Sequence, residues 1–361
     1  MGKIRVAIAG VGNVASSLIQ GVYYYKGKDE EFIPGLMHVN FGGYKIEDIE
    51  FVAAFDVDER KIGKDLSEAI LAKPNMIPKF VDLPKLGVTV EKGPVLDGVA
   101  PHMKDFRYGE GFKVDDGRPP VDVAEKLREA GADMLINLVP VGSAKAARAY
   151  AQACLDAGVA FINGMPEFIV SDPEWAAKFE KAGIPAAGDD VKSQLGATIL
   201  HRAIVKLMVE RGVVIDETYQ LNIGGNMDFL NMIEEERLKT KRISKTTAVT
   251  SMIPYEIPTR VGPSDYVPFL GDRKICYIWV KARNFGDFPI YLDVKLNVPD
   301  SPNAAGVLVD AIRAVKIALD RKIAGPLISI SAYCFKHPPK QYPDYVARQM
   351  VEEFIKGERE R

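Results

Sequence analysis

Two lysines at helical spacing are the first candidates for chemistry in this sequence. Lys241 and Lys245 are four residues apart, so they share one face if that stretch is a helix. Like charges on one face cost roughly a few tenths of a kcal/mol unless an anion lies between them. The spacing therefore indicates a site for an anionic ligand, although a solvated basic face would have the same pattern.

A second polar segment, GDDVKSQLGAT at residues 188–198, precedes a long apolar-periodic run. Ser193, Gln194 and the backbone near Gly196–Thr198 would bind an anion at a helix N-terminus, where N–H groups lack partners. An ordinary Asp or Ser cap is the alternative. The segment carries more polar groups than a cap needs, so we predict the anion site.

Weaker signals come from other polar segments. The turn Gly224–Asn226 permits a close approach of the backbone to a ligand. Lys274, Asp300 and Lys336 each lie beside Gly or Pro at the edge of a predicted element. Surface loops have the same composition, so none of these positions is informative alone.

A glycine-rich motif lies at residues 10–15, after the first predicted strand. Gly10-x-Gly12-x-x-Ala15 follows an apolar strand and begins a helix, the context in which this motif binds a dinucleotide. Gly10 permits the tight turn, Gly12 lets the backbone approach a pyrophosphate, and Ala15 allows close helix–strand packing. The helix N-terminus adds free N–H groups and a favourable dipole.

Asp56 ends the second predicted strand, where an acid binds the adenine ribose and disfavours a 2′-phosphate. Its distance from the glycines exceeds the usual spacing of about 20 residues, because residues 26–48 form a long excursion. We predict NAD rather than NADP; the alternative is a tight turn with a surface Asp. The loop Asn137–Ser143 either packs on the nicotinamide side or only connects two elements.

The elements that must position these residues follow from periodicity. Strands are predicted at Ile4–Ala9, Glu50–Phe55, Met134–Leu138, Ala160–Ile162 and Ile184–Ala187, and helices at Ser16–Tyr25, Lys61–Ala72, Val121–Ala130, Ala144–Ala157 and Trp175–Ala182. Strands that alternate with helices predict an α/β fold with a Rossmann-type, doubly wound parallel sheet.

The pattern changes near residue 196. A helix is predicted at Ala197–Arg211, β segments at Thr218–Ile223, Ala248–Ser251, Lys274–Ala282 and Ile290–Val298, and a further helix at Val307–Arg321. Alternating apolar and polar residues are typical of antiparallel strands with one buried face. We therefore predict an inserted α+β domain with a mostly antiparallel sheet at residues 197–303, and a nucleotide-binding domain at 1–196 plus 304–361.

Composition excludes several classes of protein. The 361 residues are 47% hydrophobic and 27% charged, with a net charge of −2, which gives a globular chain without a basic field for nucleic acid. No apolar stretch reaches the roughly 18–20 residues that span a bilayer. The three cysteines are far apart, and the chain begins directly with a strand, so we expect no disulfides, no signal peptide and a cytoplasmic location.

Together these segments resemble myo-inositol-1-phosphate synthase (inositol-3-phosphate synthase) in its short prokaryotic form. The resemblance runs through GVGNVASSLIQG, PGLMHVNFG, FVAAFDVD, LVPVGS, GDDVKSQLGAT, GGNMDFLN, KRISKTTAV, GPSDYV and DSPNAAGV to the Lys336 region. GDDVKSQLGAT, GGNMDFLN and ISKT in this order are highly specific. The sequence departs from the long eukaryotic form in its shorter glycine loop and in lacking extra N-terminal segments.

The resemblance implies an isomerase that converts glucose 6-phosphate to myo-inositol 1-phosphate for inositol and phospholipid biosynthesis. Its steps are NAD-dependent oxidation at C5, enolisation, intramolecular aldol cyclisation and re-reduction, with NAD recycled. It also implies a homotetramer assembled through the sheet of the inserted domain. A divalent cation stays open as a second cofactor, because branches of the family differ in cation use.

The resemblance also implies three sets of site residues. The catalytic set is Asp190, Lys241, Lys245, Lys274, Asp300 and Lys336. The NAD contacts are Gly12, Asn13, Val14, Asp56, Asp65, Ala130, Tyr150, Ser193, Asp228 and Lys241, of which Asp65, Ala130 and Tyr150 rest on the resemblance alone. The substrate phosphate is expected at Ser193, Gln194, Gly196, Thr198 and Lys245.

Two other functions fit the residues. One is an NAD-dependent oxidoreductase with a net redox change on a small phosphorylated or amino-acid-derived carbonyl substrate. The other is a non-catalytic, NAD-sensing or assembly protein, which would not need its lysines in one pocket.

Overall fold

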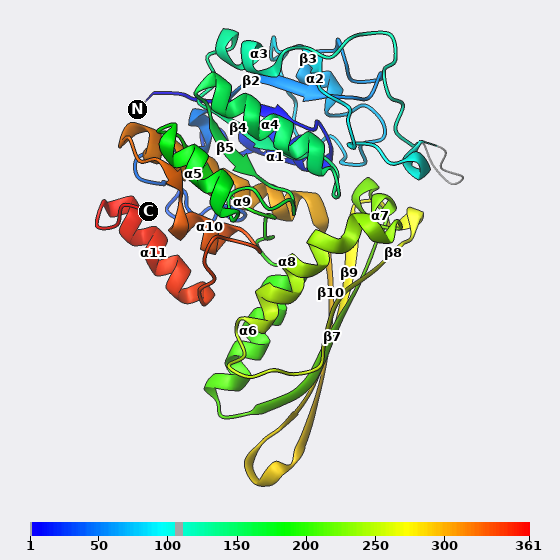
Figure 1. Ribbon diagram of the computed structural model, residues 1–361, viewed down its shortest axis with the longest axis vertical. Coiled ribbons are helices and arrows are strands. Elements are labelled where there is room, and N and C mark those ends of the chain that lie inside the picture. Colours follow the sequence, from blue (N-terminus) through cyan, green and yellow to red (C-terminus); the bar gives the residue numbers. More distant parts are fainter. Residues whose placement is uncertain (1, 105–110) are drawn as a thin grey trace.

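A seven-stranded parallel sheet forms the upper part of the molecule in Figure 1. The computed structural model describes residues 2–104 and 111–361. The strand order is β11-β6-β5-β4-β1-β2-β3, and every neighbouring pair is parallel. The strands are β1 (Ile4–Ala9), β2 (Ile49–Asp56), β3 (Val90–Lys92), β4 (Met134–Asn137), β5 (Ala160–Asn163), β6 (Pro185–Ala187) and β11 (Gly325–Pro326).

This strand order confirms the predicted doubly wound sheet. The chain adds β2 and β3 on one side of β1, then crosses over and adds β4, β5 and β6 on the other. The order reverses between β1 and β4, and ligands bind beyond the carboxyl ends of the strands at such a point. The helices that surround the sheet are α1 (Asn13–Tyr25), α2 (Leu66–Ala69), α3 (Val123–Glu129), α4 (Ala144–Ala157), α5 (Pro173–Lys181), α9 (Asp300–Asp320), α10 (Ile328–Cys334) and α11 (Asp344–Lys356).

A second, four-stranded sheet extends downward from the first in Figure 1. Its order is β10-β9-β7-β8, with bounds β7 (Val214–Gly224), β8 (Thr259–Tyr266), β9 (Arg273–Arg283) and β10 (Pro289–Pro299). Strand β9 is antiparallel to both neighbours, whereas β7 and β8 are parallel. The sheet is therefore mostly antiparallel, as predicted.

Helices α6 (Ala197–Glu210) and α8 (Lys239–Thr250) cover one face of this second sheet. Val205 of α6 and Val249 of α8 pack with Ile278 and Val280 of β9 in a separate apolar core. The chain reaches α8 from β7 through α7 (Met227–Asn231), and this crossover lets β8 run parallel to β7. The division into domains at 197–303 stays a prediction.

Several element bounds differ from the prediction. Ala248–Ser251 was predicted as strand, but Ala248–Thr250 form the last turn of α8, because Ala248 and Val249 are buried against the sheet and tertiary packing overrides local propensity. Lys61–Ala72 was predicted as a helix, but only Leu66–Ala69 is helical, and Gly63 has a positive φ of 82°.

Helix α9 starts seven residues earlier than predicted, directly after β10. Pro302 lies in its first turn, where a missing N–H costs no hydrogen bond. The helix leaves the second sheet at Asp300 and packs beside α1 under the first sheet. Asp300 therefore lies where the two sheets meet.

Two buried cations tie α6 and the segment before it to the C-terminal part of the chain. Lys192 Nζ lies 2.9 Å and Arg202 Nε 2.8 Å from the two carboxylate oxygens of Asp344. Arg202 also donates to the Tyr342 carbonyl, 2.7 Å away.

No helix among the described residues is long and apolar enough to cross a membrane.

Candidate active site

The glycine loop after β1 passes directly against the end of β4. Gly10 has φ +92°, and a Cβ atom there would lie 2.6 Å from the Leu138 carbonyl oxygen. Helix α1 starts at Asn13 behind Gly12, which offers no side-chain cap, and its first turn has no acidic residue. The first N–H groups of α1 therefore remain available to an anion, so the loop fits a dinucleotide pyrophosphate.

Asp56 is fixed at the end of β2. One carboxylate oxygen accepts the Val11 N–H at 2.8 Å, and the other accepts the N–H groups of Val57 and Asp58 at 2.7 and 2.9 Å. The buried Lys61 donates to the Val11 carbonyl at 2.8 Å and lies 3.5 Å from Asp56. These contacts hold the carboxylate and the glycine loop in one rigid unit.

A cavity beside Asp56 is bordered by the glycine loop and by Tyr150 of α4. Burial raises the pKa of the Tyr150 phenol, with a smaller contribution from Asp56. The phenol stays protonated, and its oxygen lies against Gly93, where a Cβ atom would be 2.0 Å from it. Gly12, Asn13, Asp56 and Tyr150 are thus brought together, as expected for an adenosine pocket.

Two expected NAD contacts, Ala130 and Asp65, do not line this cavity. Ala130 follows α3, and its carbonyl accepts a hydrogen bond from Arg5 at the start of β1, at the opposite edge of the sheet from the glycine loop. Asp65 caps α2, and its carboxylate is occupied by the N–H groups of Ser67, Leu86 and Gly87. Neither residue lines a cavity with the glycine loop.

A second cavity adjoins the first and contains most of the predicted catalytic residues. Gly12, Asn13, Val14 and Ser193 line it together with Asp190, Asp228, Lys241, Lys274, Asp300 and Lys336. Lys241 lies 2.6 Å from Asp228, Lys274 3.1 Å from Asp300, and Lys336 2.8 Å from Asp190. Side chains that are distant in sequence therefore form three ion pairs beside the predicted dinucleotide loop.

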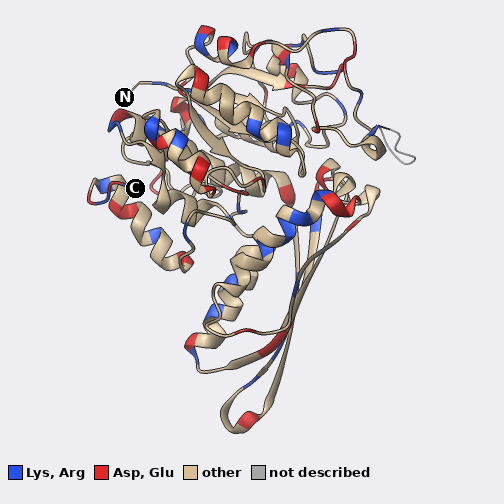
Figure 2. Ribbon diagram, viewed as in Figure 1, with Lys and Arg blue, Asp and Glu red and all other residues tan. Residues whose placement is uncertain are grey.

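These side chains come from both sheets. Lys241 and Lys245 lie on one buried face of α8, as their spacing predicts, and Lys274 is near the start of β9. Asp190 and Lys336 follow β6 and α10, where the Lys336 N–H donates to the Asp190 carbonyl at 2.7 Å. Figure 2 shows basic residues along α8 where it approaches the first sheet.

Asp190 is the carboxylate most tightly enclosed by the lysines. Its backbone has φ +64°, and its second carboxylate oxygen accepts the Ser244 hydroxyl at 2.6 Å. Burial acts to raise its pKa, but Lys336, Lys241 and the hydrogen bonds outweigh burial and lower the pKa. Asp190 therefore stays ionised, and Ser244 of the ISKT motif is a contact that the sequence prediction missed.

The lysines differ in their protonation. Burial acts to lower the pKa of Lys241, but Asp228 and Asp190 outweigh it and raise the pKa. For Lys336, burial and the charges of Lys241 and Lys274 lower the pKa despite Asp190. Lys241 is therefore a permanent cation, whereas Lys336 releases a proton more readily than an ordinary lysine.

Lys245 has the most unfavourable environment of the four lysines. Its side chain is buried, and no hydrogen bond or ion pair joins it to the described residues. Burial and repulsion from Lys274, Lys241 and Lys336 hold its pKa well below the ordinary value. An anion bound beside Lys245 would supply the charge that its surroundings lack.

The Gly224–Asn226 turn contacts both the chain and the cavity. A Cβ atom on Gly225 would lie 2.5 Å from the Val267 carbonyl oxygen, so Gly225 packs against the chain itself, whereas Asn226 lines the cavity. The Asn226 amide donates to Asp272 at 3.1 Å and to Asp300 at 3.4 Å. Asn226 and Asp272 thus position Asp300, and neither role was predicted.

The predicted phosphate segment is only partly assembled around the cavity. Ser193 lines it, whereas Gln194 points into a neighbouring cavity between α1 and α9 and donates to the Gly35 carbonyl at 3.0 Å. Gly306 leaves room for the Gln194 side chain on that side, so Gln194 does not line the cavity with Ser193. Gly196 caps α6 through its backbone, and Thr198 is buried in the first turn.

Metal ligands were left open by the sequence. In the described ranges, no group of three or more His, Cys, Asp or Glu side chains is placed to hold a metal ion. The three cysteines are buried and free.

Comparison with known proteins identifies the family. Residues 196–301 match the family model for myo-inositol-1-phosphate synthase. Over 99% of both chains, the sequence is 54% identical to an inositol-3-phosphate synthase of Mycolicibacterium smegmatis. The chain belongs to the inositol-3-phosphate synthase family.

Further comparisons agree with this assignment. An inositol-3-phosphate synthase of Corynebacterium glutamicum is 53% identical over 98% of both chains. The crystal structure of a myo-inositol-1-phosphate synthase-related protein from Thermotoga maritima covers 98% of both chains with a TM-score of 0.79 and 27% identity. The similarity extends over both sheets, as the sequence resemblance implied.

We predict that Gly10→Ala abolishes binding of NAD, the dinucleotide expected from the motif. The new Cβ would collide with the Leu138 carbonyl, and the positive φ adds strain. Gly21→Ala in the middle of α1 is the matched control, since nothing lies within 4 Å of its Cβ position. Titration of NAD by calorimetry gives the affinities; equal affinity for Gly10→Ala and the unmodified chain would contradict the assignment of the loop.

Proposed function

We propose that this protein is an NAD-dependent inositol-3-phosphate synthase that converts D-glucose 6-phosphate to 1L-myo-inositol 1-phosphate. The observation that carries the proposal is the cavity in which Lys241, Lys274 and Lys336, each paired with a carboxylate, lie beside the glycine loop. Relatives with this name align over the whole chain. Burying this many charged groups costs desolvation free energy, and a non-catalytic protein would not need them in one place.

NAD, when bound, accepts a hydride from C5 of the open-chain sugar and returns it after ring closure. The backbone at Gly10 and Gly12 and the N-terminus of α1 would hold its pyrophosphate, and Asp56 its adenine ribose. Leu138, Val139 and Pro140 after β4 would form the wall beside the nicotinamide, because they line both cavities.

Lysine cations suit the cyclisation because negative charge develops on two oxygens. The ketone at C5 acidifies C6, and the enolate formed there attacks the C1 aldehyde, so charge develops on O5 and then on O1. Preorganised donors at such oxygens are each worth roughly 2–4 kcal/mol. Lys274, fixed by Asp300, and Lys241, fixed by Asp228, can supply this charge without moving.

The differences in pKa indicate which lysine transfers a proton and which only stabilises negative charge. Lys336 has a lowered pKa and an ionised partner, Asp190. We therefore propose that the Lys336 amine accepts the proton of the C5 hydroxyl during oxidation. Lys241, with its raised pKa, is assigned to charge stabilisation alone. The substrate phosphate itself is available as a base for the C6 proton.

The phosphate is assigned to Lys245, Ser193 and the N-terminus of α6. Lys245 is buried with no carboxylate within ion-pair distance among the described residues. The N–H groups that follow Gly196 are unpaired because they start the helix, and no side chain caps them. Thr198 contributes its backbone N–H rather than its side chain to this site. The Gln194 side chain points into the neighbouring cavity and is not part of the site in this structure.

The reaction itself gives the direct test. Purified protein with glucose 6-phosphate and catalytic NAD should form a cyclitol phosphate, detected by phosphorus NMR, without a net change in NADH absorbance. Lys274→Ala should abolish product while NAD still binds, and Lys206→Ala on α6, whose ammonium group pairs with Glu210, is the control. Steady NADH accumulation without a cyclitol would favour instead an oxidoreductase acting on a phosphorylated or amino-acid-derived carbonyl compound.

We predict that substrate binding protonates Lys245. In the free protein, burial and the neighbouring lysines hold its pKa well below the ordinary value, so Lys245 loses its proton at a lower pH than an ordinary lysine. A bound phosphate raises that pKa, so the complex takes up a proton. Calorimetry of glucose 6-phosphate binding without NAD, in two buffers of different ionisation enthalpy, measures the uptake, which Lys245→Met should remove. Equal uptake by the variant would separate Lys245 from the phosphate.

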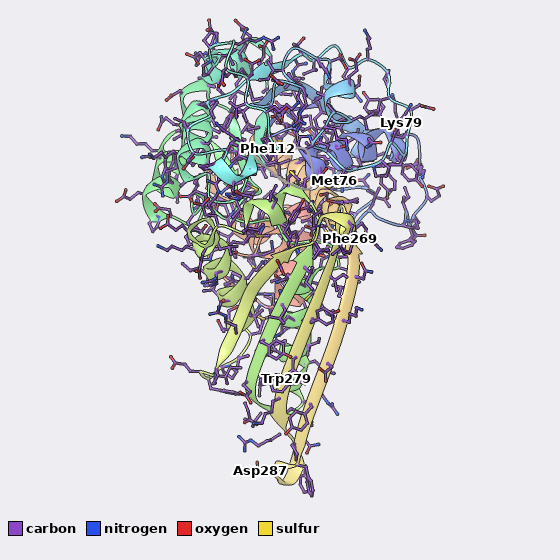
Figure 3. All side chains as sticks on the ribbon, turned by 90° about the vertical axis from the view of Figure 1, so that its right-hand side faces the viewer. Met76, Lys79, Phe112, Phe269, Trp279 and Asp287 are labelled. Carbon is purple, nitrogen blue, oxygen red and sulfur yellow. The ribbon has the colours of Figure 1, made fainter. Side chains whose placement is uncertain are left out.

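A homotetramer is proposed from the outer face of the second sheet. Tyr219, Tyr277 and Tyr291 are exposed there, and Trp279 stacks on Tyr219 with ring centroids 5.3 Å apart. Figure 3 shows Trp279 midway along this sheet, above Asp287 at its tip. Contiguous exposed aromatic surface of this kind is typical of an interface, and a second copy of the chain is the occupant we propose.

We predict that the double variant Tyr219→Asp, Trp279→Asp lowers the mass measured by light scattering from that of a tetramer to that of a smaller species. Two buried charges would oppose association because they lose their hydration. The control is Phe285→Asp at the sheet tip, which is almost fully exposed. A monomeric mass for the unmodified chain would contradict the proposal.

The remaining parts of the proposal concern organisation and context. We assign residues 1–196 plus 304–361 to the NAD-binding domain and residues 197–303 to the catalytic and tetramerisation domain. The product would serve inositol and phospholipid biosynthesis in the cytoplasm, where free cysteines persist. A divalent cation remains part of the prediction as a second cofactor.

A further inference from the structure

Arg237 joins the segment that leads into α8 to the loop after β4. It lies in the short helical turn Glu235–Leu238, immediately before the helix that carries Lys241 and Lys245. Its guanidinium donates to the Val141 carbonyl at 3.0 Å, to the Asp97 carbonyl at 3.0 Å and to the Ser143 hydroxyl at 3.1 Å. One side chain thus contacts two loops that belong to the first sheet.

Those two loops form walls of the predicted NAD site. Leu138, Val139 and Pro140, just before Val141, line both cavities, and Pro94 and Gly98 on either side of Asp97 line the adenosine cavity. The position of Arg237 is therefore fixed by the same backbone that would contact the dinucleotide.

Other contacts support this junction. Asn231 of α7 donates to the Val141 carbonyl as well, at 2.6 Å. Gly142 has φ +78°, and a Cβ atom there would lie 2.7 Å from the Arg237 Cβ atom. The loop therefore requires a glycine at this position in order to admit Arg237.

We propose that Arg237 is a positioning residue that couples NAD occupancy to the placement of the lysine helix. NAD bound against the loop after β4 would restrict the motion of Val141 and Ser143. Because Arg237 is hydrogen-bonded to both residues, it would restrict the motion of α8 as well. Helix α8 must stay in place between oxidation and re-reduction. This inference deepens the proposed function, because it concerns how the same site retains its oxidised intermediate.

The proposal predicts an uncoupled enzyme when the contact is lost. In the normal cycle, the C5 alcohol is oxidised while NAD is reduced, and the hydride later returns to C5. If α8 shifts in between, the 5-keto sugar phosphate and NADH escape together, one of each per failed cycle. The ratio of released NADH to cyclitol phosphate measures this leak, and a loss of stability alone would not change it.

The test compares Arg237→Met with Arg242→Met, a control on α8 whose guanidinium pairs with the exposed Glu235. Arg237→Met should lower kcat about 100-fold, the scale of a small misplacement of catalytic groups, and should release NADH. Gly142→Ala should reproduce both effects, since it displaces Arg237 without altering it. Arg237→Lys should rescue little, because an ammonium cannot make three directed contacts.

A second measurement is independent of catalysis. Hydrogen exchange of the α8 amides should slow when NAD is added to the unmodified chain and to Arg242→Met, but not to Arg237→Met or Gly142→Ala. This exchange measurement tests the coupling between NAD binding and α8 even if glucose 6-phosphate is not the substrate. A failure of this inference can therefore be told apart from a failure of the proposed function. NAD-dependent protection of α8 in Arg237→Met, or NADH release no greater than in Arg242→Met, would overturn the proposal; if that variant does not fold, Gly142→Ala gives the same decision.

Discussion

Repulsion among four neighbouring lysines is the interaction on which the rest of the site depends. Lys241, Lys274 and Lys336 each have a carboxylate partner within 3.1 Å, whereas Lys245 has none among the described residues. Burying unpaired charge is costly, so the site is tolerable only because three carboxylates are fixed beside the lysines. The carboxylates are in turn held by Ser244, Asn226 and the local backbone.

This constraint explains why two sheets are needed. A single parallel sheet presents its loops at one edge, which is enough for a dinucleotide but not for a ring of opposing charges. Helix α8 and strand β9 bring Lys241, Lys245 and Lys274 from the second sheet, and the loops near Asp190 and Lys336 bring the remainder from the first. Helix α9 begins at Asp300 at the junction, so its first residue serves the site while its body packs under the first sheet.

Local signals in the sequence predicted much of this arrangement. The strand Ile4–Ala9 and the helix Ala144–Ala157 have the predicted bounds because each depends on neighbouring residues only, whereas α1 begins at Asn13, three residues before the predicted start. Lys241 and Lys245 share a helix face for the same reason. Ala130 was expected at the NAD site from the resemblance alone; the structure places it at the end of α3, beside Arg5 and away from the glycine loop.

Contacts between distant segments could not be predicted in this way. Gly225 looks like a ligand-binding glycine until the structure places Val267 against it. Gln194 has the right chemistry for phosphate, but Gly306, more than a hundred residues later, opens a space on the other side. Arg237 reads as one more charge in a basic run, and only the fold brings it to Val141 and Ser143.

The charge balance also explains how the site can serve both binding and chemistry. Among the described residues, three lysines line the cavity with three carboxylates, and Lys245 lies near these lysines without a carboxylate of its own, so a protonated Lys245 leaves an excess of positive charge beside the cavity. A sugar phosphate brings about −1.5 to −2 charges at neutral pH, which is more than this excess. The phosphate can therefore be matched by Lys245 and the α6 N-terminus, away from the three paired lysines. Those lysines keep their places, held by carboxylates that are already bonded, so an oxyanion formed on the sugar finds charge that need not reorganise.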